Sequence, residues 1–463
     1  MGKKPLPGAG KAFQLWTRRE FVAHLAACGA LSPLFALAGA TVSPVQQLTE
    51  PSREPPYKLS SYDEALLDEL EKAACLYFWE QSNPSTGLVK DRSTPDEFDD
   101  YTIASIAATG FGLSALCIAD KRGFIPSSAV VSRVRAALKF LARELYNQRG
   151  FFFHFVDINT GERAFDCEVS SIDTGLLLCG VLMCRQYFAD PQIGSLAAEI
   201  FDRVDWLWML NRGRTLSHGW TPEHGFLPYR WNTYCELMLI YLLGIGSRTH
   251  AIPASSWDAW WRPIFEYHGL RYIGSYAPLF VHQYSHAWFD FRGKRDRYAN
   301  YFQNSVLATE AHRLFCISLH SRFPDFDDNL WGVTASDSVD GYTWWGGPPP
   351  VGAIDGTLVP CAPAGSLPEG LQKRSPSGRP AGPAARRAGR APGAWFAVSA
   401  CRLLRLDTMP LRSRDRHKTV ADREGSRASG VDVDEYCRET SKRIGRHRRT
   451  VAPGTEAPNR NLR

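Results

Sequence analysis

The stretch that decides the fold is EVSSIDTGLLLCGVLMCRQYF, residues 168–188. It begins with acidic and hydroxyl side chains and continues as a mostly apolar run. Ser and Asp are favoured at the start of a helix because their side chains accept hydrogen bonds from backbone N–H groups that lack helical partners. The stretch therefore predicts an apolar helix that starts near Ser170 and carries acids at its N-terminus.

The blocks on either side of this helix have the same periodicity, with apolar residues at intervals of three and four. They predict further helices at 63–80, 102–119, 128–145, 193–210, 231–244 and 305–320. Long loops rich in Trp, His and Asp separate alternate helices, at 81–101, 146–169, 211–230, 269–300 and 324–365. Loops of this length are usually functional. An all-α fold follows, in which long helices alternate with aromatic loops on one side, as in a helical toroid.

The composition of the 463-residue chain is that of a globular protein, with 44% hydrophobic and 22% charged residues. Its formal net charge of +6 is unevenly distributed. The first 40 residues carry +4 and the last 98 carry +12, so residues 41–365 carry −10. An acidic body repels phosphates, which argues against a nucleic-acid partner.

The first 40 residues have the features of an export signal. Arg18 and Arg19 precede the moderately apolar segment 23–40, which ends in small residues that fit an A-x-A-like cleavage site. This arrangement resembles a twin-arginine signal, so we expect a periplasmic or secreted protein with a linker at 41–59. The alternative is an uncleaved membrane anchor, but the segment is short and broken by Pro33. No later stretch approaches 18 uninterrupted apolar residues, so no stable membrane span is expected after cleavage.

The last part of the chain, 368–463, differs in composition from the body. It contains only three of the 56 aromatic residues, and Arg, Pro, Ala and Gly dominate it. Such a segment buries too little apolar surface to offset the entropy of ordering it. We favour a reading-frame shift as its origin, with a disordered basic tail that binds anions or nucleic acid and a small separate domain as the alternatives. The predicted catalytic domain therefore covers 60–367.

The eleven cysteines are dispersed singly, and no CxxC pair or Cys/His cluster has the spacing of a zinc site. Several lie inside apolar runs, where cysteine packs as a small hydrophobic residue. The sequence therefore predicts no metal, no cofactor and no disulfide framework, although a single disulfide stays open.

Three acids cluster around the start of the central helix: Asp166, Glu168 and Asp173. Helix capping is an alternative interpretation of each of them. Asp166 and Asp173 are seven positions apart and would share a helix face if the helix extended that far. Asp173 also has the apolar neighbours Ile172 and Leu176, which indicate a semi-buried acid.

Glu236 lies in the predicted helix 231–244, which is apolar on nearly all sides. A buried carboxylate is costly unless it is paired or protonated. An apolar setting raises the pKa of a carboxyl group, which is what a general acid requires. Glu236 is thus either a catalytic acid or a structural, hydrogen-bonded one.

Two later segments, 283–293 and 331–346, mix aromatic rings with Asp, His and Gln. Aromatic faces suit the apolar C–H faces of a sugar, and the polar side chains suit its hydroxyls. Core packing is the alternative for each Trp taken singly. Together with the acid-rich loops, these segments favour carbohydrate as the substrate.

Several motifs occur in an order that resembles a known family. They are FWE at 78–80, GLVKDR at 87–92, ATGFG at 108–112, EVSSIDT at 168–174, Glu236 with its apolar flank, HQYSH at 282–286 and WGVTASD at 331–337. Together they resemble the glucoamylase-like domain family that includes glycoside hydrolase family 144, the endo-β-1,2-glucanases. The resemblance covers 60–367. It implies an (α/α)6 barrel that hydrolyses a β-glucan by inversion in a groove at the barrel mouth.

The resemblance and the aromatic loops together give the candidate site residues. The catalytic candidates are Glu236, Asp173, Asp337 and Glu168. Glu236 and Asp173 rank first: one donates a proton to the leaving oxygen, and the other, or Asp337, activates water. The substrate-binding candidates are Asp91, Arg92, His154, Asp166, Trp231, Tyr234, Gln283, His286, Trp288, Trp344, Trp345 and Asp355.

The resemblance also has implications for the end of the chain. In the family, an aromatic-rich loop and further helices follow the position of Leu367 and close the barrel, whereas this chain departs from that pattern at Glu369. We therefore expect a barrel that is incomplete at its C-terminus, which leaves the activity of this chain open. The alternatives to a hydrolase are a non-catalytic or damaged glycan-binding protein and a glucan transglycosylase on the same scaffold.

Overall fold

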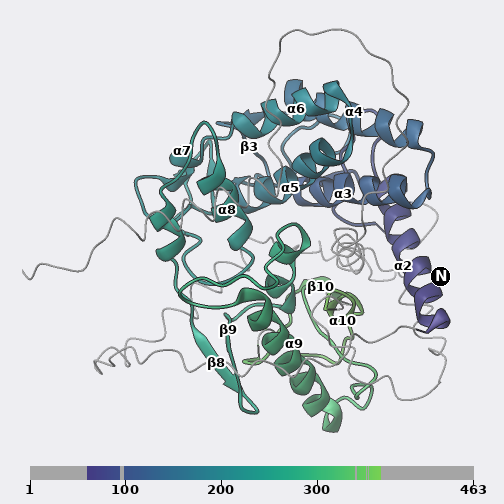
Figure 1. Cartoon of the computed structure of the whole chain (residues 1–463), viewed down its shortest axis with the longest axis vertical. Coiled ribbons are helices and arrows are strands. Elements are labelled where there is room, and N and C mark those ends of the chain that lie inside the picture. Colours follow the sequence, from purple (N-terminus) through teal and green to yellow (C-terminus); the bar gives the residue numbers. More distant parts are fainter. Residues whose placement is uncertain (1–59, 94–98, 339–340, 351, 353, 367–463) are drawn as a thin grey trace, which may run out of the picture.

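The computed structural model describes residues 60–93, 99–338, 341–350, 352 and 354–366 (Figure 1). The predicted export signal and linker at 1–59 and the predicted tail at 368–463 lie outside the described residues. None of the helices in the described part is long and apolar enough to cross a membrane.

Helices are the main regular elements of the described structure, and short strands lie between them. The α-helices are α2 (Ser61–Glu80), α3 (Ile106–Arg122), α4 (Ser127–Arg143), α5 (Ser171–Tyr187), α6 (Pro191–Asp202), α7 (Trp206–Leu210), α8 (Met238–Gly246), α9 (Tyr301–Ser318) and α10 (Cys361–Ala364). The strands are β1 (Ile103–Ser105), β2 (Asn147–Gln148), β3 (Phe151–Phe152), β4 (Phe155–Asp157), β5 (Val169–Ser170), β6 (Gly219–Thr221), β7 (Gly225–Phe226), β8 (Ile264–Tyr267), β9 (Leu270–Ile273), β10 (Ser336–Ser338) and β11 (Gly341–Thr343). Short 3-10 helices lie at Ala254–Asp258, Leu279–His282, Tyr284–Ala287 and Leu319–Ser321.

The helices of the first half form two layers. α3, α5 and α8 lie in the interior, and α4 and α6 pack over α3 and α5 from outside (Figure 1). The sequence explains this order, because α3 and α5 are buried along most of their length on all sides, whereas α4 and α6 bury one face. An apolar helix forms a core, and an amphipathic helix covers it.

Glycines bring the interior helices into close contact. A Cβ atom on Gly180 of α5 would lie 2.1 Å from the backbone oxygen of Gly110 on α3, a distance that no side chain tolerates. Gly175, two positions after Asp173, faces α8 in the same way, since its Cβ would lie 2.4 Å from Cγ2 of Ile240. The first two turns of α5 therefore lie beside the first turn of α8.

A row of short extended segments joins the starts of these helices. β1 pairs with β4, Phe153 forms a bridge with Val169 of β5, and β5 pairs with β6. Lys90 adds a bridge to Ala104 in β1. We call this row the strip. Because β1 runs directly into α3 and β5 into α5, these two interior helices begin at the strip.

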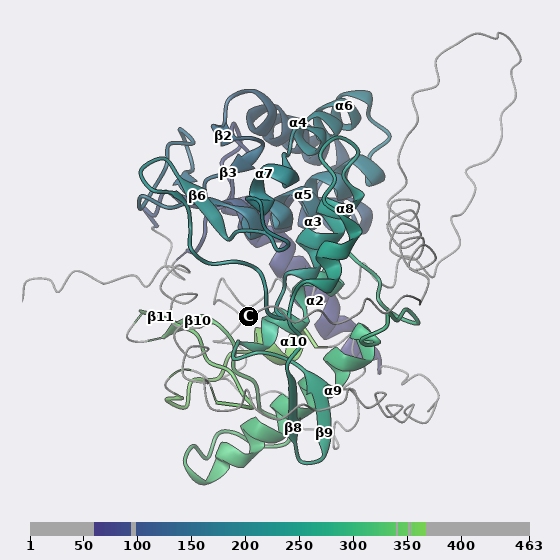
Figure 2. The ribbon, with the colours of Figure 1, turned by 90° about the vertical axis from the view of Figure 1, so that its left-hand side faces the viewer.

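The second half of the chain folds around α9. The β8–β9 hairpin packs on α9, and apolar residues of the later segment 331–361 pack in the same region. Figure 2 shows α9, β8 and β9 at the opposite end of the molecule from α4 and α6. Small apolar clusters around Phe315 and Ala311 form the core of this part, separate from the main core of the first half.

The predicted helices are largely confirmed, with three corrections. The helices predicted at 63–80, 128–145, 170–188 and 305–320 correspond to α2, α4, α5 and α9. The one predicted at 102–119 starts later, because 103–105 pairs with β4 as a strand. The one predicted at 193–210 is split into α6 and α7, and Asp205 caps the second piece. The prediction for 231–244 is wrong in its first half, since α8 begins only at Met238.

The mainly helical fold is confirmed, but the description all-α needs a correction. The long connections contain short paired strands, because chains that run side by side must satisfy their backbone N–H and C=O groups. The eight cysteines within the described ranges are not joined in disulfides. Two of them, Cys117 on α3 and Cys184 on α5, lie side by side in the core, with sulfur atoms 3.7 Å apart.

Candidate active site

The N-terminus of α5 carries an acid that the sequence singled out. Ser170 caps the helix by accepting a hydrogen bond from the backbone N–H of Asp173, at 3.3 Å. The Ser170 hydroxyl in turn donates to Asp173 Oδ2 at 2.6 Å. Asp173 is only 1% exposed and is therefore more buried than predicted. The spacing Ser-x-x-Asp explains this geometry, because one residue caps the helix and also fixes the carboxyl group of the other.

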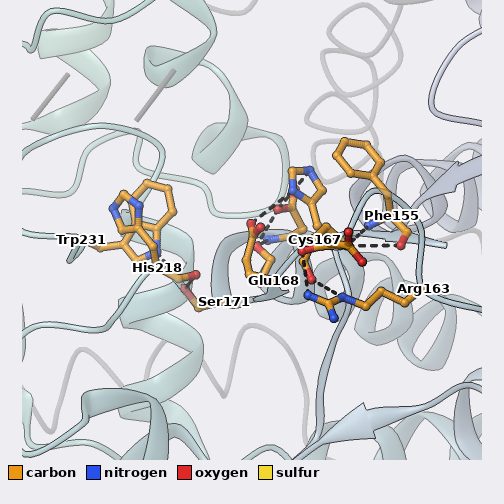
Figure 3. Close-up of polar contacts among 11 residues, drawn as sticks. Phe155, Arg163, Cys167, Glu168, Ser171, His218 and Trp231 are labelled. Atoms are coloured by element: carbon orange, nitrogen blue, oxygen red, sulfur yellow. Dashed lines mark hydrogen bonds and ion pairs between the residues drawn. The ribbon is translucent and has the colours of Figure 1, made fainter. Parts of the chain in front are cut away.

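His154 lies between two of the predicted acids. Its Nδ1 is 3.3 Å from Glu168 Oε1, and its Nε2 is 3.5 Å from Asp173 Oδ2 (Figure 3, around Glu168). The strip holds this group in place: the backbone N–H of His154 donates to Glu168 O, and that of Ile106, at the start of α3, donates to His154 O. An imidazole that contacts two carboxylates is able to hold a proton beside either of them.

Opposing influences act on the pKa of Glu168. Burial raises this pKa, but the hydrogen bond and the charge of His154, with a smaller contribution from His218, lower it, and the net shift is downward. Glu168 is therefore ionised near neutral pH. It fits the role of an acceptor better than that of a proton donor.

A second group of contacts begins one residue further along, at Ser171. Its hydroxyl donates to the backbone oxygens of Ser217 and His218, at 2.7 and 2.9 Å, and accepts a hydrogen bond from Trp231 Nε1 at 2.8 Å. The His218 ring stacks on Trp231 with the centroids 4.0 Å apart (Figure 3). These contacts fix the predicted sugar-binding Trp231 beside the start of α5, with its indole N–H already bonded to the protein.

Glu236 lies in a turn and not in a helix, which corrects the sequence-based prediction. The preceding segment is held by long-range contacts in place of helical ones: Tyr234 N donates to Trp261 O, and Ser285 Oγ donates to Glu236 O at 3.0 Å. The predicted burial of Glu236 is confirmed, because it is 4% exposed. Since α8 begins two residues later and its first turn lies beside α5, Glu236 and Asp173 occupy the same end of this helix pair.

Arg92 connects the early and late parts of the chain. Its guanidinium lies 2.8 Å from Asp91 Oδ2 and 2.7 Å from Asp337 Oδ1. Burial lowers the pKa of Arg92, but the two carboxylates outweigh this effect and the net shift is upward, so Arg92 stays charged. The backbone N–H of Asp91 donates to Ile103 O, which attaches the group to the strip. The structure thus brings together three candidates from distant parts of the sequence.

Four predicted substrate contacts lie in the interior. Three of them form hydrogen bonds within the protein: Gln283 with Ala362 and Ser366, His286 with Ser305, and Tyr234 with His282. The fourth, Trp345, is 1% exposed and belongs to an apolar cluster. We therefore leave these four side chains out of the proposed sugar contacts.

The remaining candidates lie at different depths. Asp166 is exposed in the loop before α5 and has a φ of 47°, so it does not share a helix face with Asp173. Trp288 is half-buried, and its indole N–H donates to a hydroxyl on α3. Trp344 is half-buried, and Asp355 is exposed and accepts a backbone hydrogen bond within its own turn.

His154, Glu168 and Asp173 also form a group that could hold a metal ion, with one ligand atom from each lying within 4.8 Å of the others. The spacing of these three residues in the sequence matches no metal motif, so only the fold brings them together. The expectation that the chain needs no metal stays a prediction. The same atoms face one another as ion pairs, which gives the group a structural role without a cation.

The sequence missed the parts of the site that depend on contacts between loops. Phe155, whose ring stacks on His154 with the centroids 3.8 Å apart, and His218 are not among the predicted residues. No local pattern pointed to them. Ser171 is also absent from the prediction, although it lies within the motif EVSSIDT, so a signal for it was present.

Comparison with known proteins confirms the family resemblance. The family model described as "Glycoamylase: Putative glucoamylase" matches residues 228–374. A curated relative, the exo β-1,2-glucooligosaccharide sophorohydrolase (non-reducing end) of Parabacteroides distasonis, is 27% identical over an alignment of 348 residues. The match covers 66% of this chain and 47% of the relative. The chain therefore spans about half the length of this curated relative.

Solved structures share the fold. The endo-β-1,2-glucanase from Chitinophaga pinensis, in complex with sophorotriose and glucose, is 25% identical with a TM-score of 0.62, covering 73% of this chain and 83% of that chain. The β-1,2-glucanase from Parabacteroides distasonis is 21% identical with a TM-score of 0.64, covering 76% of this chain and 57% of that chain. The named relatives with sequence similarity are glycoside hydrolases.

Proposed function

We propose that this chain is a glycoside hydrolase that cleaves β-1,2-linked glucan with a carboxylic general acid and a carboxylate general base. The observation that carries the proposal is the position of Asp173 and Glu236 at the same end of two packed helices, beside the strip. This reaction typically requires two carboxyl groups that flank the glycosidic bond.

The names of the relatives support the substrate. One is named for β-1,2-gluco-oligosaccharides and the other for endo-β-1,2-glucan cleavage. The net charge of −10 on residues 41–365 suits a neutral sugar better than a polyanion. The two names differ in endo or exo action, so the proposal extends to the linkage and not to the position of cleavage along the chain.

We assign the general acid to Glu236 and the general base to Asp173. Glu236 is buried in the turn before the apolar helix α8, a setting that suits a carboxyl group that gives its proton to the leaving oxygen. Asp173 lies in the first turn of α5, and its Oδ2 accepts a hydrogen bond from Ser170. This bond fixes the orientation of the carboxylate that takes a proton from water. His154, which contacts both Asp173 and the ionised Glu168, positions the carboxylate of Asp173.

The proposed course is inverting, as the resemblance implied. An inverting enzyme holds its two carboxyl groups roughly 6.5–9.5 Å apart, which leaves room for a water molecule, whereas a retaining enzyme holds them about 5–5.5 Å apart. Proton NMR of the first product distinguishes the two courses, because inversion of a β-linkage releases the α-anomer. The β-anomer as the first product would contradict inversion.

Two wider proposals follow from the same resemblance. The alternation of interior helices (α3, α5, α8) with covering helices (α4, α6) supports an (α/α)6 barrel whose mouth is the strip. The adjacent Arg18 and Arg19 before an apolar segment support export by the twin-arginine route, with action on glucan outside the cytoplasm. Replacing both arginines with lysine and following the cellular location of the chain tests the second proposal.

The principal experiment measures the release of reducing sugar from linear β-1,2-glucan. Glu236→Gln and Asp173→Asn keep the shape of each side chain and remove its acid, so each is expected to reduce turnover by several orders of magnitude. Glu69→Gln, on the exposed face of α2, is the matched control and is expected to keep the turnover of the unaltered chain. Full turnover in Glu236→Gln would refute the assignment of the acid.

The same experiment separates the alternatives. Binding of glucan without any turnover by the unaltered chain would identify a glycan-binding protein. Transfer of glucosyl units to another sugar, detected as longer products, would identify a transglycosylase. Release of free reducing ends alone supports the hydrolase.

A further inference from the structure

A short loop in front of α5 presents an aromatic ring to solvent. Phe165 is 48% exposed. Phe165 and Asp166 both have left-handed backbone conformations, with φ of 56° and 47°. Residues with a Cβ atom rarely adopt this conformation, and a bulky residue does so least readily. The loop thus holds an unfavourable backbone shape while it leaves 48% of an apolar ring exposed, and neither the shape nor the exposed part of the ring stabilises the fold.

Arg163 fixes this shape. Its guanidinium donates to the backbone oxygens of Asp166 and Cys167, both at 2.6 Å (Figure 3). The same group pairs with Glu223 at 2.6 Å, from the turn between β6 and β7. The Cys167 sulfur also accepts a hydrogen bond from the backbone N–H of Phe155. The loop is therefore held from two sides and presents its ring in a defined place.

The exposed ring is connected to the candidate active site. Phe165 packs edge-on against Phe155, with the ring centroids 5.7 Å apart and an interplanar angle of 77°. Phe155 stacks on His154, which contacts Glu168 and Asp173. Two consecutive ring contacts thus lead from the surface to the acids.

We propose that Phe165 is a stacking platform for one glucose ring at an outer subsite of the proposed glucan site, with the carboxylate of Asp166 accepting hydrogen bonds from hydroxyls of that sugar. This inference rests on the proposed function and adds one bound sugar to it. The C–H face of a glucose ring is apolar and packs on an aromatic ring, while its rim requires hydrogen-bond acceptors. A platform that is already held in place loses little entropy when the sugar binds.

The test compares the affinity of the full chain for β-1,2-gluco-oligosaccharides of increasing length, measured by titration calorimetry. Phe165→Ala is expected to weaken the binding of long oligosaccharides by about five- to tenfold. The shortest oligosaccharide that still binds is expected to keep its affinity, because it does not reach the outer subsite. Phe165→Trp retains a platform and is expected to keep the affinity for long chains.

The control removes another exposed ring from a different place. Tyr62 is 61% exposed in the first turn of α2, about 27 Å of helix from the end that adjoins the strip. Tyr62→Ala is expected to bind oligosaccharides of every length as the unaltered chain does. Thermal unfolding of Phe165→Ala is expected close to that of the unaltered chain, because the substitution removes a half-exposed ring that makes one edge-on contact with Phe155.

The possible outcomes are distinct. Equal affinity of Phe165→Ala and the unaltered chain at every length would overturn the subsite and leave the proposed function intact. If the unaltered chain binds no β-glucan of any length, the proposed function fails, and the subsite with it. If sedimentation shows a dimer of the unaltered chain that Phe165→Ala dissociates, the ring belongs to a contact between two copies and the subsite is overturned.

Discussion

Arg92 and Asp337 form an ion pair with 2.7 Å between Nη1 and Oδ1, although 245 positions separate them in the sequence. The pair joins the segment after α2 to the β10–β11 hairpin, and thus the first described part of the chain to one of the last. Asp337 keeps 53% of its side chain exposed, so water and salt screen the interaction.

A double-mutant cycle measures this pair. Arg92→Ala and Asp337→Ala are each expected to lower the free energy of unfolding by about 0.5–1 kcal/mol, as is usual for a partly exposed pair. The double variant is expected to lose little more than Arg92→Ala alone, because both substitutions remove the pair with Asp337. Arg92→Ala also removes the contact with Asp91. Urea unfolding at about 0.1 M and about 0.5 M NaCl tests the expectation, because the higher salt concentration screens the pair more strongly. Additive losses at both salt concentrations would show that the two residues do not interact.

The position of His154 predicts a change in the pH dependence of Glu168. The hydrogen bond and the charge of His154 lower the pKa of this acid, against the effect of burial. His154→Gln removes the charge, so the pKa of Glu168 is expected to rise. The acidic limb of the activity profile would then move to higher pH, and the carboxyl carbon of Glu168 would titrate at higher pH in NMR. An unchanged titration would show that His154 does not control this acid.

Three buried histidines predict a loss of stability in mild acid. Burial lowers the pKa of His282 to about 3 and those of His286 and His312 to about 4, with neighbouring histidines contributing at His282. In the unfolded chain each titrates near 6.5. Their contribution to stability is therefore complete above about pH 6.5 and is lost as the pH falls toward 4, because the unfolded chain takes up the protons first.

Urea unfolding between pH 7 and pH 4.5 measures this effect. The slope of the unfolding free energy against pH reports how many more protons the unfolded chain binds than the folded one. In the acidic part of this range, that number is expected to approach one for each buried histidine. His312 donates from Nδ1 to Gly347 O and accepts at Nε2 from Val333 N, and His312→Gln can retain one of these bonds while removing one titrating group. This variant is expected to be less stable at pH 7 but to have a shallower slope. Stability that stays constant from pH 7 to pH 5 would contradict the prediction.

The close approach of α3 and α5 predicts a severe effect of a single methyl group. Gly180→Ala would place Cβ against the backbone oxygen of Gly110, so we expect a loss of about 1–3 kcal/mol in unfolding free energy. Gly194→Ala, in α6, is the matched control. No atom lies within 4 Å of the added Cβ there, and the same substitution is expected to stabilise the protein by about 0.5–1 kcal/mol. Equal effects of the two substitutions would show that the helices are not in backbone contact.

Removal of metal ions tests the group formed by His154, Glu168 and Asp173. These residues make ion pairs with one another, and the proposed reaction uses only carboxyl groups. Dialysis against EDTA is therefore expected to leave turnover and melting temperature unchanged. Loss of activity that a divalent cation restores would instead assign a metal to this group.

The start of α5 was predictable because its chemistry is local. Ser170 and Asp173 are three positions apart, and the cap that joins them depends on backbone geometry that any helix start provides. The segment before Glu236 was not predictable for the opposite reason. Its apolar pattern suits a helix, but contacts of Tyr234 with Trp261 and of Trp231 with Ser171 hold it in another conformation.

The sequence also could not predict which residues contact one another across the site. His154 reaches Glu168 and Asp173 through the strip, and Arg92 reaches Asp337 through the approach of two distant segments. Residue types and the order of motifs indicated which side chains matter. Only the fold determined which of them touch, and it directed Gln283 and Trp345 into the interior.

The backbone of His154 is bonded on one side to the first residue of α3 and on the other to Glu168, three residues before the first residue of α5. The position of its imidazole therefore depends on how α3 and α5 are aligned along their axes. A sliding motion of α3 along α5 would pull the main chain of His154 and change the spacing of its ring from both carboxylates. The chemical shifts of this one ring would then report mechanical deformation of the core, and any ligand that straightens or compresses the helix pair would be visible there without touching the histidine.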